Sequence, residues 1–331
     1  MTVVSAPGKV TLFGEHAVVY GEPAIAAAIN RRVRVEISKR ADGAIRVEAR
    51  DLMLAGFKAL LTATGSITLE GESGKVLAAL SYVKRAIEVV REAYGVTVGA
   101  HIAITSEMPV GAGLGTSAAV AVAVVKAYSL LGGVEITRRE CAELGYRVEL
   151  GVQGSASRMD STVTSMGGVL YITPRGEEPY RELKVPSSVK GLVVGYVSRE
   201  ASTGEMVARV RRLKEELGEP IDLAIRAIGE VTRKAKASLE KGDVIEVGRL
   251  MNVNHGLLEA IGVSTSRLSQ MVYAARSAGA LGSKITGAGG GGCIIALAPG
   301  AEDEVVAALR AVGASAFKVD FSREGVTVEE S

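Results

Sequence analysis

An uncharged run of 18 residues, from Met108 to Val125, limits most strongly how this chain can fold. Its length comes close to that of a membrane span, which needs about 20 apolar residues. However, its first part, PVGAGLG, contains a proline and three glycines and is typical of a loop, and Lys126 ends the run. The run therefore predicts a glycine loop followed by a buried helix over residues 117–131.

A glycine loop directly before a helix is an arrangement that can bind anions. Free N–H groups at the helix start and the helix dipole favour negative charge, and glycines let the backbone approach it closely. Pro109–Ser117 is therefore a candidate phosphate-binding loop, with a tight turn that holds no ligand as the alternative. It is not a Walker A loop, because no lysine precedes Thr116 and Ser117. Ser117 could act only as an N-cap, or its hydroxyl could reach a magnesium ion carried by a nucleotide.

Two further segments combine glycines with polar residues. Residues 287–292, GAGGGG, match GxGxxG, but the apolar run CIIALA behind them predicts a strand. A dinucleotide site would need a helix there, so a glycine hairpin that another loop or a nucleotide can approach is the better interpretation. Residues 6–21, APGKVTLFGEHAVVYG, place Lys9, Glu15 and His16 among apolar strand residues, which predicts a polar cleft between strands.

Local patterns predict an α+β fold in two halves. Runs rich in β-branched residues predict strands over 3–13 and 24–38, and Asp42-Gly43 predicts a hairpin turn after the second. Apolar spacing predicts a helix over 74–94, and TRRE at 137–140 predicts a capping box. The polar stretch PRGEEPYRELKVPSS is the best linker candidate. We therefore expect an N-terminal domain over 1–175 and a C-terminal domain over 176–331.

Composition excludes several classes of protein. Lys and Arg number 39 against 37 Asp and Glu, so the net charge of +2 gives no attraction for nucleic acid or an anionic membrane. Aromatic residues make up only 4%, too few for platforms that stack nucleic-acid bases. Cys141 and Cys293 have no CxxC spacing, so we expect a reducing, cytoplasmic environment. The first residues lack the pattern of a secretory signal, and we expect none.

The three segments together resemble the three motifs of the GHMP kinases. PGKVTLFGEHAVVYG is similar to motif one, PVGAGLGTSAA to motif two and KITGAGGGGC to motif three, in the family's order. Within the family, GEHAVVYG is most similar to members that phosphorylate mevalonate, in their compact archaeal form. The resemblance implies a two-domain fold with the active site in the cleft between the halves. It also implies ATP- and Mg²⁺-dependent phosphorylation of the C5 hydroxyl of mevalonate, giving 5-phosphomevalonate for isoprenoid biosynthesis.

The resemblance also assigns site residues by their place in the motifs. Asp160 and Lys9 would be catalytic, and Ser117 and Glu149 would hold Mg²⁺, because Glu149 lies the family's eleven residues before the catalytic aspartate. The substrate would contact His16, Glu15 and Thr203. The nucleotide would contact the motif-two segment and a serine upstream of it: Ser106, Pro109, Val110, Gly111, Ala112, Gly113, Leu114, Gly115, Thr116 and Ser117.

Each of these roles has a plainer alternative in the residues themselves. Asp160 could be a helix cap, and Lys9 could be a solvated lysine. The apolar spacing after Thr203 predicts a helix with Thr203 as its N-cap. Glu149 lies near the end of an expected helix, where the dipole disfavours an acid, which makes a bound cation plausible. Whether Asp160 removes the proton of the alcohol or only orients the hydroxyl stays open. A kinase of phosphomevalonate or of a sugar, a nucleotide-binding regulator without catalysis, and a homodimer also stay open.

Overall fold

The computed structural model describes residues 1–49, 57–61, 67–70, 74–109, 112–154, 156–176 and 178–330. Its strands are β1 (Thr2–Phe13), β2 (Ala24–Arg40), β3 (Ile45–Ala49), β4 (Phe57–Leu61), β5 (Ile67–Glu70), β6 (Gly99–Ser106), β7 (Val169–Ile172), β8 (Tyr180–Leu183), β9 (Leu192–Val197), β10 (Gly282–Thr286), β11 (Gly292–Leu297), β12 (Ser315–Val319) and β13 (Thr327–Glu330). Its helices are η1, a 3-10 turn (Ala17–Tyr20), α1 (Gly74–Tyr94), α2 (Thr116–Leu131), α3 (Arg138–Gln153), α4 (Arg158–Met166), α5 (Thr203–Leu217), α6 (Glu219–Lys241), α7 (Val244–Ala260), α8 (Ser266–Ser277) and α9 (Glu302–Ala311).

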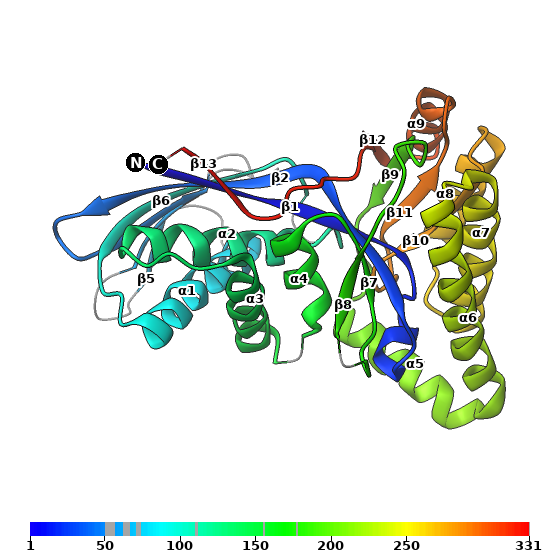
Figure 1. Ribbon diagram of the computed structural model, residues 1–331, viewed down its shortest axis with the longest axis horizontal. Helices are drawn as coiled ribbons and strands as arrows, with labels where there is room; N and C mark the ends of the chain where they lie inside the picture. The colour runs from blue at the N-terminus through cyan, green and yellow to red at the C-terminus, as the bar shows by residue number, and fades with distance from the viewer. Residues whose placement is uncertain are drawn as a thin grey trace.

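The first part of the molecule is a mixed sheet with helices on one face (Figure 1). Its strand order is β13-β1-β2-β6-β3-β4-β5, and β7 joins the start of β2 and carries β8 on its other side. Helices α1 to α4 lie together below this sheet (Figure 1). Because β2 runs for 17 residues, it can pair with β7 at its start and with β6 further along. It therefore connects the β7–β8 branch to the rest of the sheet.

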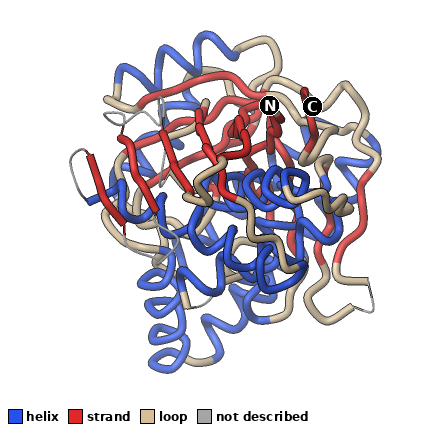
Figure 2. Tube along the Cα trace, turned by 90° about the vertical axis from the view of Figure 1, so that its left-hand side faces the viewer, coloured by secondary structure: helices blue, strands red, loops and turns tan. Residues whose placement is uncertain are grey.

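The second part is a smaller antiparallel sheet with the order β10-β11-β9-β12. Helices α8 and α9 pack on this sheet, and α6 packs against α7, which in turn contacts β10. The view turned by 90° shows helices above and below the strands, with the two chain ends near each other (Figure 2). The strand β1 meets β10 and α7 where the two parts join.

The glycine loop and the buried helix behind it are where the sequence predicts them. Helix α2 begins at Thr116, and its residues from Ala118 to Ser129 are almost all buried, because alanine and valine occupy every side of it. Among the helices of the described chain, none is long and apolar enough to cross a membrane. The capping box of Thr137 and Glu140 is also confirmed, at the start of α3.

Three local expectations differ from the structure or stay untested. The strands around Asp42-Gly43 do not form a hairpin, because β6 lies between β2 and β3 and pairs with both. The helix that we expected to be capped by Thr203 has Ser202 as its N-cap, with Glu205 completing a capping box. The domain boundary at residue 175 stays a prediction, since β8 and β13 belong to the first sheet and β9 opens the second.

Candidate active site

Lys9 and Asp160 meet where β1 packs against α4. Lys9 lies in the middle of β1 and is buried, and its Nζ is 3.0 Å from Asp160 Oδ1. Lys9 Nζ also donates to Thr11 Oγ1 at 3.3 Å, so the ammonium is held between two oxygens. Asp160 is the third residue of α4, but the N-cap of this helix is Ser157, whose side chain accepts from Met159 N. The capping alternative for Asp160 is therefore wrong, and a solvated Lys9 is excluded by its burial.

Glu149 lies next to this pair and has an unusual environment. It is 5% exposed on α3, and burial, reinforced by the nearby Asp160 carboxylate, raises the pKa of Glu149 well above its usual value, against the effect of Lys9. Its Oε2 has no hydrogen-bond partner among the described residues. Two carboxylates close together, of which Glu149 is buried, favour a divalent cation, and oxygen atoms are the ligands that Mg²⁺ prefers. Glu149 therefore fits a metal ligand.

Ser117, in the first turn of α2, lies near the carboxylates of Glu149 and Asp160. Its side chain hydrogen-bonds to the hydroxyl of Tyr82, which also accepts from Gln153 Nε2 at 2.6 Å. Glu149 and Asp160 both raise the pKa of Tyr82, in addition to burial, so their charges act on this hydroxyl. Ser117 is thus held near the carboxylates, where a hydroxyl could join Glu149 in holding a cation.

The motif-two loop is packed directly onto Lys9. Lys9 N donates to Leu114 O at 2.7 Å, and Gly115 has a left-handed φ of 72° at the helix start. A Cβ on Gly115 would come within 2.8 Å of Lys9 Cγ, so this glycine allows the close approach. Thr116 Oγ1 donates to Pro109 O and closes the loop. This packing brings the N-terminus of α2, which favours anions, to the lysine.

Of the residues expected to contact the nucleotide, Ser106 has its hydroxyl engaged within the protein. Ser106 Oγ donates to Met108 O at 2.9 Å and accepts from Met108 N at 3.1 Å, so its hydroxyl serves the turn after β6. The expected contacts of Val110 and Gly111 lie outside the described residues. The other expected residues, Ala112, Gly113, Leu114, Gly115 and Thr116, lie in the loop beside Lys9 or lead from it into α2.

Motif three is the turn between β10 and β11, as expected of a glycine hairpin. Gly287 and each glycine from 289 to 292 have positive φ, a conformation that other residues adopt only with strain. A Cβ on Gly292 would lie 3.1 Å from Ala112 O, so the hairpin touches the motif-two loop. The three segments, far apart in the sequence, therefore converge around Lys9.

The end of motif one is held by the second part of the molecule. The Glu15 carboxylate forms an ion pair with Lys284 on β10 and accepts from Asn254 Nδ2 at 3.4 Å. His16 Nε2 is 2.8 Å from Ala288 O, to which it donates, and burial lowers the pKa of His16. Glu15 and His16 thus lie at the junction of the two parts, and the Glu15 carboxylate is engaged within the protein.

Thr203 joins the site through an arginine that the sequence patterns did not single out. Thr203 is the first residue of α5, and its Oγ1 accepts from Arg199 Nη1 at 3.2 Å. The Arg199 guanidinium also lies against the Cα positions of Gly113 and Gly292, where an added Cβ would meet it at 2.9 and 3.2 Å. Arg199 therefore brings positive charge to the two glycine loops, which the motif-two loop itself lacks.

Sequence reasoning missed four residues of this arrangement, namely Tyr82, Gln153, Arg199 and Lys284. Tyr82 follows the apolar spacing of α1, so it cannot be distinguished from a core residue by pattern. Arg199 follows a strand with no motif around it. Only Lys284 had a signal, because it stands in an expected strand directly before a glycine turn, and a lysine that is buried there needs a partner.

Comparison with known proteins gives a consistent result for the whole chain. The sequence matches the GHMP kinases N terminal domain over residues 81–168, the GHMP kinases C terminal region over 235–315 and a galactokinase galactose-binding signature over 2–39. Mevalonate kinase from Thermococcus gammatolerans is 48% identical, over 99% of this chain and 98% of that protein. Mevalonate kinase from Methanothermobacter thermautotrophicus is 38% identical, over 97% of this chain and 98% of that protein.

Solved structures agree with the sequence relatives. L. major mevalonate kinase in complex with R-mevalonate has a TM-score of 0.81 at 27% identity, over 95% of this chain and 94% of that one. The Methanococcus jannaschii mevalonate kinase has a TM-score of 0.80 at 28% identity, over 96% and 98% of the two chains. This chain belongs to the GHMP kinase family, and the expected two-domain α+β fold is confirmed. Within the family, the two sequence relatives named above, which are 48% and 38% identical over nearly the whole chain, are mevalonate kinases.

Proposed function

We propose that this protein transfers the γ-phosphoryl group of ATP to the C5 hydroxyl of mevalonate, giving 5-phosphomevalonate for isoprenoid biosynthesis. The observation that carries the proposal is the 3.0 Å contact between Lys9 and Asp160 directly beside the motif-two loop. The proposal is supported because a carboxylate and an ammonium group lie next to a loop that suits phosphate. The choice of mevalonate is supported by mevalonate kinases that are 38% and 48% identical over 97% and 99% of the chain.

The chemistry that these residues must supply is mainly alignment and neutralisation of charge. Asp160 accepts the proton of the C5 hydroxyl of mevalonate. The hydroxyl oxygen forms a bond to the γ-phosphorus of ATP, and the bond between the γ-phosphorus and the oxygen that leaves with ADP breaks. Lys9, 3.0 Å from Asp160 Oδ1, balances the charge that spreads over the transferring group. The amides at the start of α2 bind the phosphates, and His16 and Thr203 contact mevalonate.

Mg²⁺ is part of the proposal as the ion that accompanies ATP. Ser117 and Glu149 would hold it, which is supported by a buried Glu149 Oε2 without a partner in the described chain. Bound there, the ion would neutralise phosphate oxygens and position the γ-phosphoryl group. A cytoplasmic location also belongs to the proposal, and the two free, buried cysteines, Cys141 and Cys293, support it.

The test is an assay of ADP release by the purified protein with ATP, Mg²⁺ and one of four acceptors. We expect turnover with mevalonate and none with phosphomevalonate, galactose or homoserine. Equal or faster turnover with one of the other three would contradict the choice of substrate. Nucleotide binding without turnover of any acceptor would instead indicate a regulator that has lost catalysis.

A further inference from the structure

The Glu15–Lys284 pair is a buried ion pair that joins the two parts of the molecule outside the Lys9–Asp160 contact. Lys284 is 0% exposed and Glu15 3% exposed, and they stand 269 positions apart in the sequence. The second carboxylate oxygen of Glu15 accepts from the fully buried Asn254 of α7. Both oxygens of Glu15 are therefore held by elements of the second part.

Stability alone is a weak explanation for such a pair. Burial raises the pKa of Glu15 and lowers the pKa of Lys284, because each charge loses its water, and their mutual attraction opposes both effects. Replacing a buried ion pair by neutral groups is often harmless to stability, whereas removing one partner alone is strongly destabilising. The Glu15–Lys284 pair is therefore better explained by the position in which it holds its two segments than by a contribution to stability.

The residue after Glu15 has a conformation that needs such support. His16 has a φ of 59°, and it is the one residue other than glycine with positive φ in the described ranges. This conformation is strained for a histidine and persists only where the surroundings fix it. Its ring donates to Ala288 O, four residues beyond Lys284 on the motif-three hairpin. Two neighbouring residues of motif one are thus attached to the same hairpin, at Lys284 and at Ala288.

We propose that Glu15 and Lys284 are positioning residues that hold His16 against the motif-three hairpin in the orientation that binds the acceptor substrate. The pair fixes the backbone at Glu15 relative to β10, and His16 can then keep its strained conformation and its contact with Ala288. This inference rests on the proposed function, in which His16 contacts mevalonate. It assigns Glu15 an indirect effect on the substrate, exerted through its neighbour.

The key variant is the double substitution Glu15→Gln/Lys284→Met. The Glu15→Gln change removes the negative charge and still offers an oxygen to Asn254, while the methionine fills the space of the lysine stem, so no unpaired charge remains buried. We expect this variant to keep the melting temperature and the KM for ATP of the wild type. Its KM for mevalonate should rise about tenfold, the value of one lost, well-placed hydrogen bond, with little change in kcat. The single variants Glu15→Gln and Lys284→Met should show the same rise in KM together with a lower melting temperature.

A second measurement follows His16 without any substrate. The protein contains 3 histidines, so the ring nitrogens can be assigned in NMR spectra of protein labelled with ¹⁵N-histidine. The Nε2–H signal of His16 should show the hydrogen bond to Ala288 in the wild type and lose it in the double variant. Persistence of this signal, or a KM for mevalonate that returns to the wild-type value in the double variant, would overturn the proposal.

The chain offers a matched control in the same segment. Glu22 forms an ion pair with Arg233 of α6 at 3.0 Å, which also joins the two parts but is partly exposed. Glu22→Gln should leave the KM for mevalonate and the His16 signal unchanged, since exposed pairs contribute little. A rise in KM equal to that of the double variant would show that any such contact matters, and would overturn the specific role of Glu15. If the wild type itself does not turn over mevalonate, the proposed function fails, and the NMR signal still decides whether the pair positions His16.

Discussion

Lys9 is the residue around which the site is organised. Its ammonium contacts Asp160 and Thr11, its backbone N–H contacts Leu114, and its side-chain stem packs on Gly115. A cation fixed at so many points loses little freedom when it meets a developing charge, which is the property that electrostatic catalysis requires. The lysine can therefore serve the transferring group without a rearrangement of its own.

Replacement of Asp160 tests the base directly. Asp160→Asn keeps the size of the side chain and removes its charge and basicity, so kcat should fall by about 10²–10⁴ while the KM for ATP barely changes. Steady-state kinetics measure both constants. The Asp160→Asn/Lys9→Met variant should lose less than the product of the two single losses, because residues that act as a unit are not additive. Near-normal turnover of Asp160→Asn would refute a catalytic role.

Replacement of Glu149 tests the metal ligand. Glu149→Gln should lower kcat and raise the Mg²⁺ concentration needed for half-maximal activity, because an amide oxygen attracts a cation less than a carboxylate does. In metal-free buffer the variant should melt at a higher temperature than the wild type, since it removes a buried charge beside Asp160. A magnesium titration and a thermal melt measure the two effects. An unchanged Mg²⁺ requirement would exclude Glu149 from the metal site.

The buried His255 of α7 should make the stability of the protein depend on pH. It is 1% exposed, and burial lowers its pKa to about 4, with Arg276 and Lys284 acting in the same direction and Glu259 opposing them. Below pH 6.5 the unfolded chain binds a proton that the folded protein does not, so stability is lost as the pH falls towards 4. Between pH 4 and 6.5, His255→Phe should reduce the dependence of the free energy of unfolding on pH by up to about 1.4 kcal/mol per pH unit. Urea titrations at several pH values measure this dependence. The same pH dependence in the wild type and in His255→Phe would contradict this role of His255.

The resemblance assigned roles to most motif residues of the candidate site and to Glu149 and Asp160, but it missed Lys284 of motif three and the residues that only the fold brings to the site. The resemblance to the family's motifs singled out Lys9 and the glycine loops, because the residues by themselves also fit a solvated lysine and a turn that holds no ligand. Tyr82 and Arg199 come from elements without any motif, and only tertiary packing brings them to the loops. The engagement of Glu15 by Lys284 was also invisible, since it joins residues 269 positions apart.

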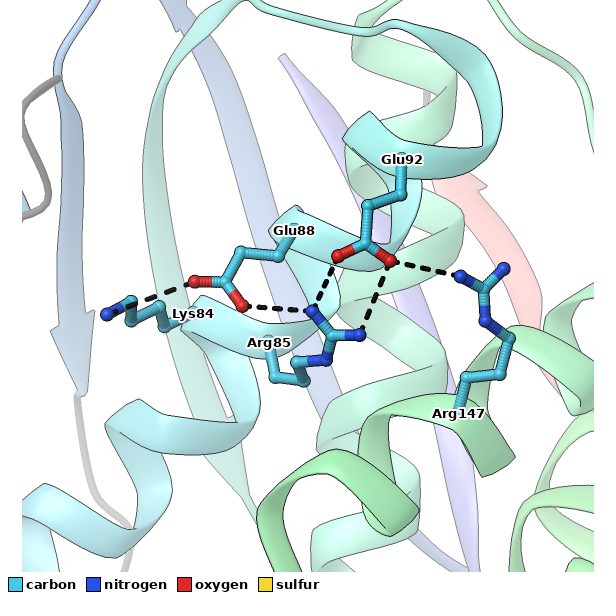
Figure 3. Close-up of polar contacts among 5 residues, drawn as sticks. All are labelled: Lys84, Arg85, Glu88, Glu92 and Arg147. Carbon is cyan, nitrogen blue, oxygen red and sulfur yellow. Dashed lines mark hydrogen bonds and ion pairs between the residues drawn. The ribbon is translucent and has the colours of Figure 1, made fainter.

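At the scale of elements, a surface network of charged residues ties α1 to α3 (Figure 3). Glu92 is its centre: its carboxylate contacts Arg85 of the same helix at 2.7 Å and Arg147 of α3 at 3.0 Å. Arg85 contacts Glu88 at 3.1 Å, and Lys84 lies at the margin, 3.9 Å from Glu88. Tyr82 lies on α1 and Glu149 lies on α3. The network therefore helps to fix the two helices that carry these residues of the candidate site.

Glu92→Gln should weaken this connection between the helices. Networks of exposed ion pairs contribute modestly, so we expect the free energy of unfolding to fall by about 1 kcal/mol, and less in high salt. Urea titrations at low and high salt measure the effect. Lys84→Gln is the control, since it removes only the 3.9 Å contact and should cost almost nothing. An equal loss for both variants would contradict the central place of Glu92.

Helices were predicted better than strand neighbours. The expected helix over 74–94 coincides with α1, because its apolar spacing and its end at Gly95 are local signals. The hairpin expected at Asp42-Gly43 failed, because the turn signal fixes a change of direction but not the partner of the next strand. Strand β6, which follows only after α1, enters between the two and pairs with each.

At the scale of the whole molecule, the chain returns to its beginning. Strand β13 pairs with β1, and Val3 lies opposite Glu330 (Figure 1). On the way, Arg32 Nη2 donates to Gly325 O at 2.7 Å and Arg138 Nε donates to Val326 O at 3.2 Å. The last residues therefore complete the first sheet, although the second part of the molecule precedes them.

Truncation after Arg323 tests this arrangement. It removes β13, the acceptors of both arginines and the buried Val326 side chain, so the free energy of unfolding should fall by several kcal/mol, at about 1 kcal/mol for each lost hydrogen bond. Urea titrations followed by circular dichroism measure the loss. Stability equal to that of the full chain would show that the β1 edge does not need its partner.

The pairing of β1 with β13 has a consequence for synthesis in the cell. The ribosome makes β1 long before β13, so the outer edge of β1 stays open until β13 has been made. An open strand edge is a template for wrong partners, including the same strand of another nascent chain. A circular permutant, with the old ends joined and new ends at the exposed turn around Gly218, would make β13 and β1 a hairpin. The pairing would become local, and the edge would close within seconds of its synthesis.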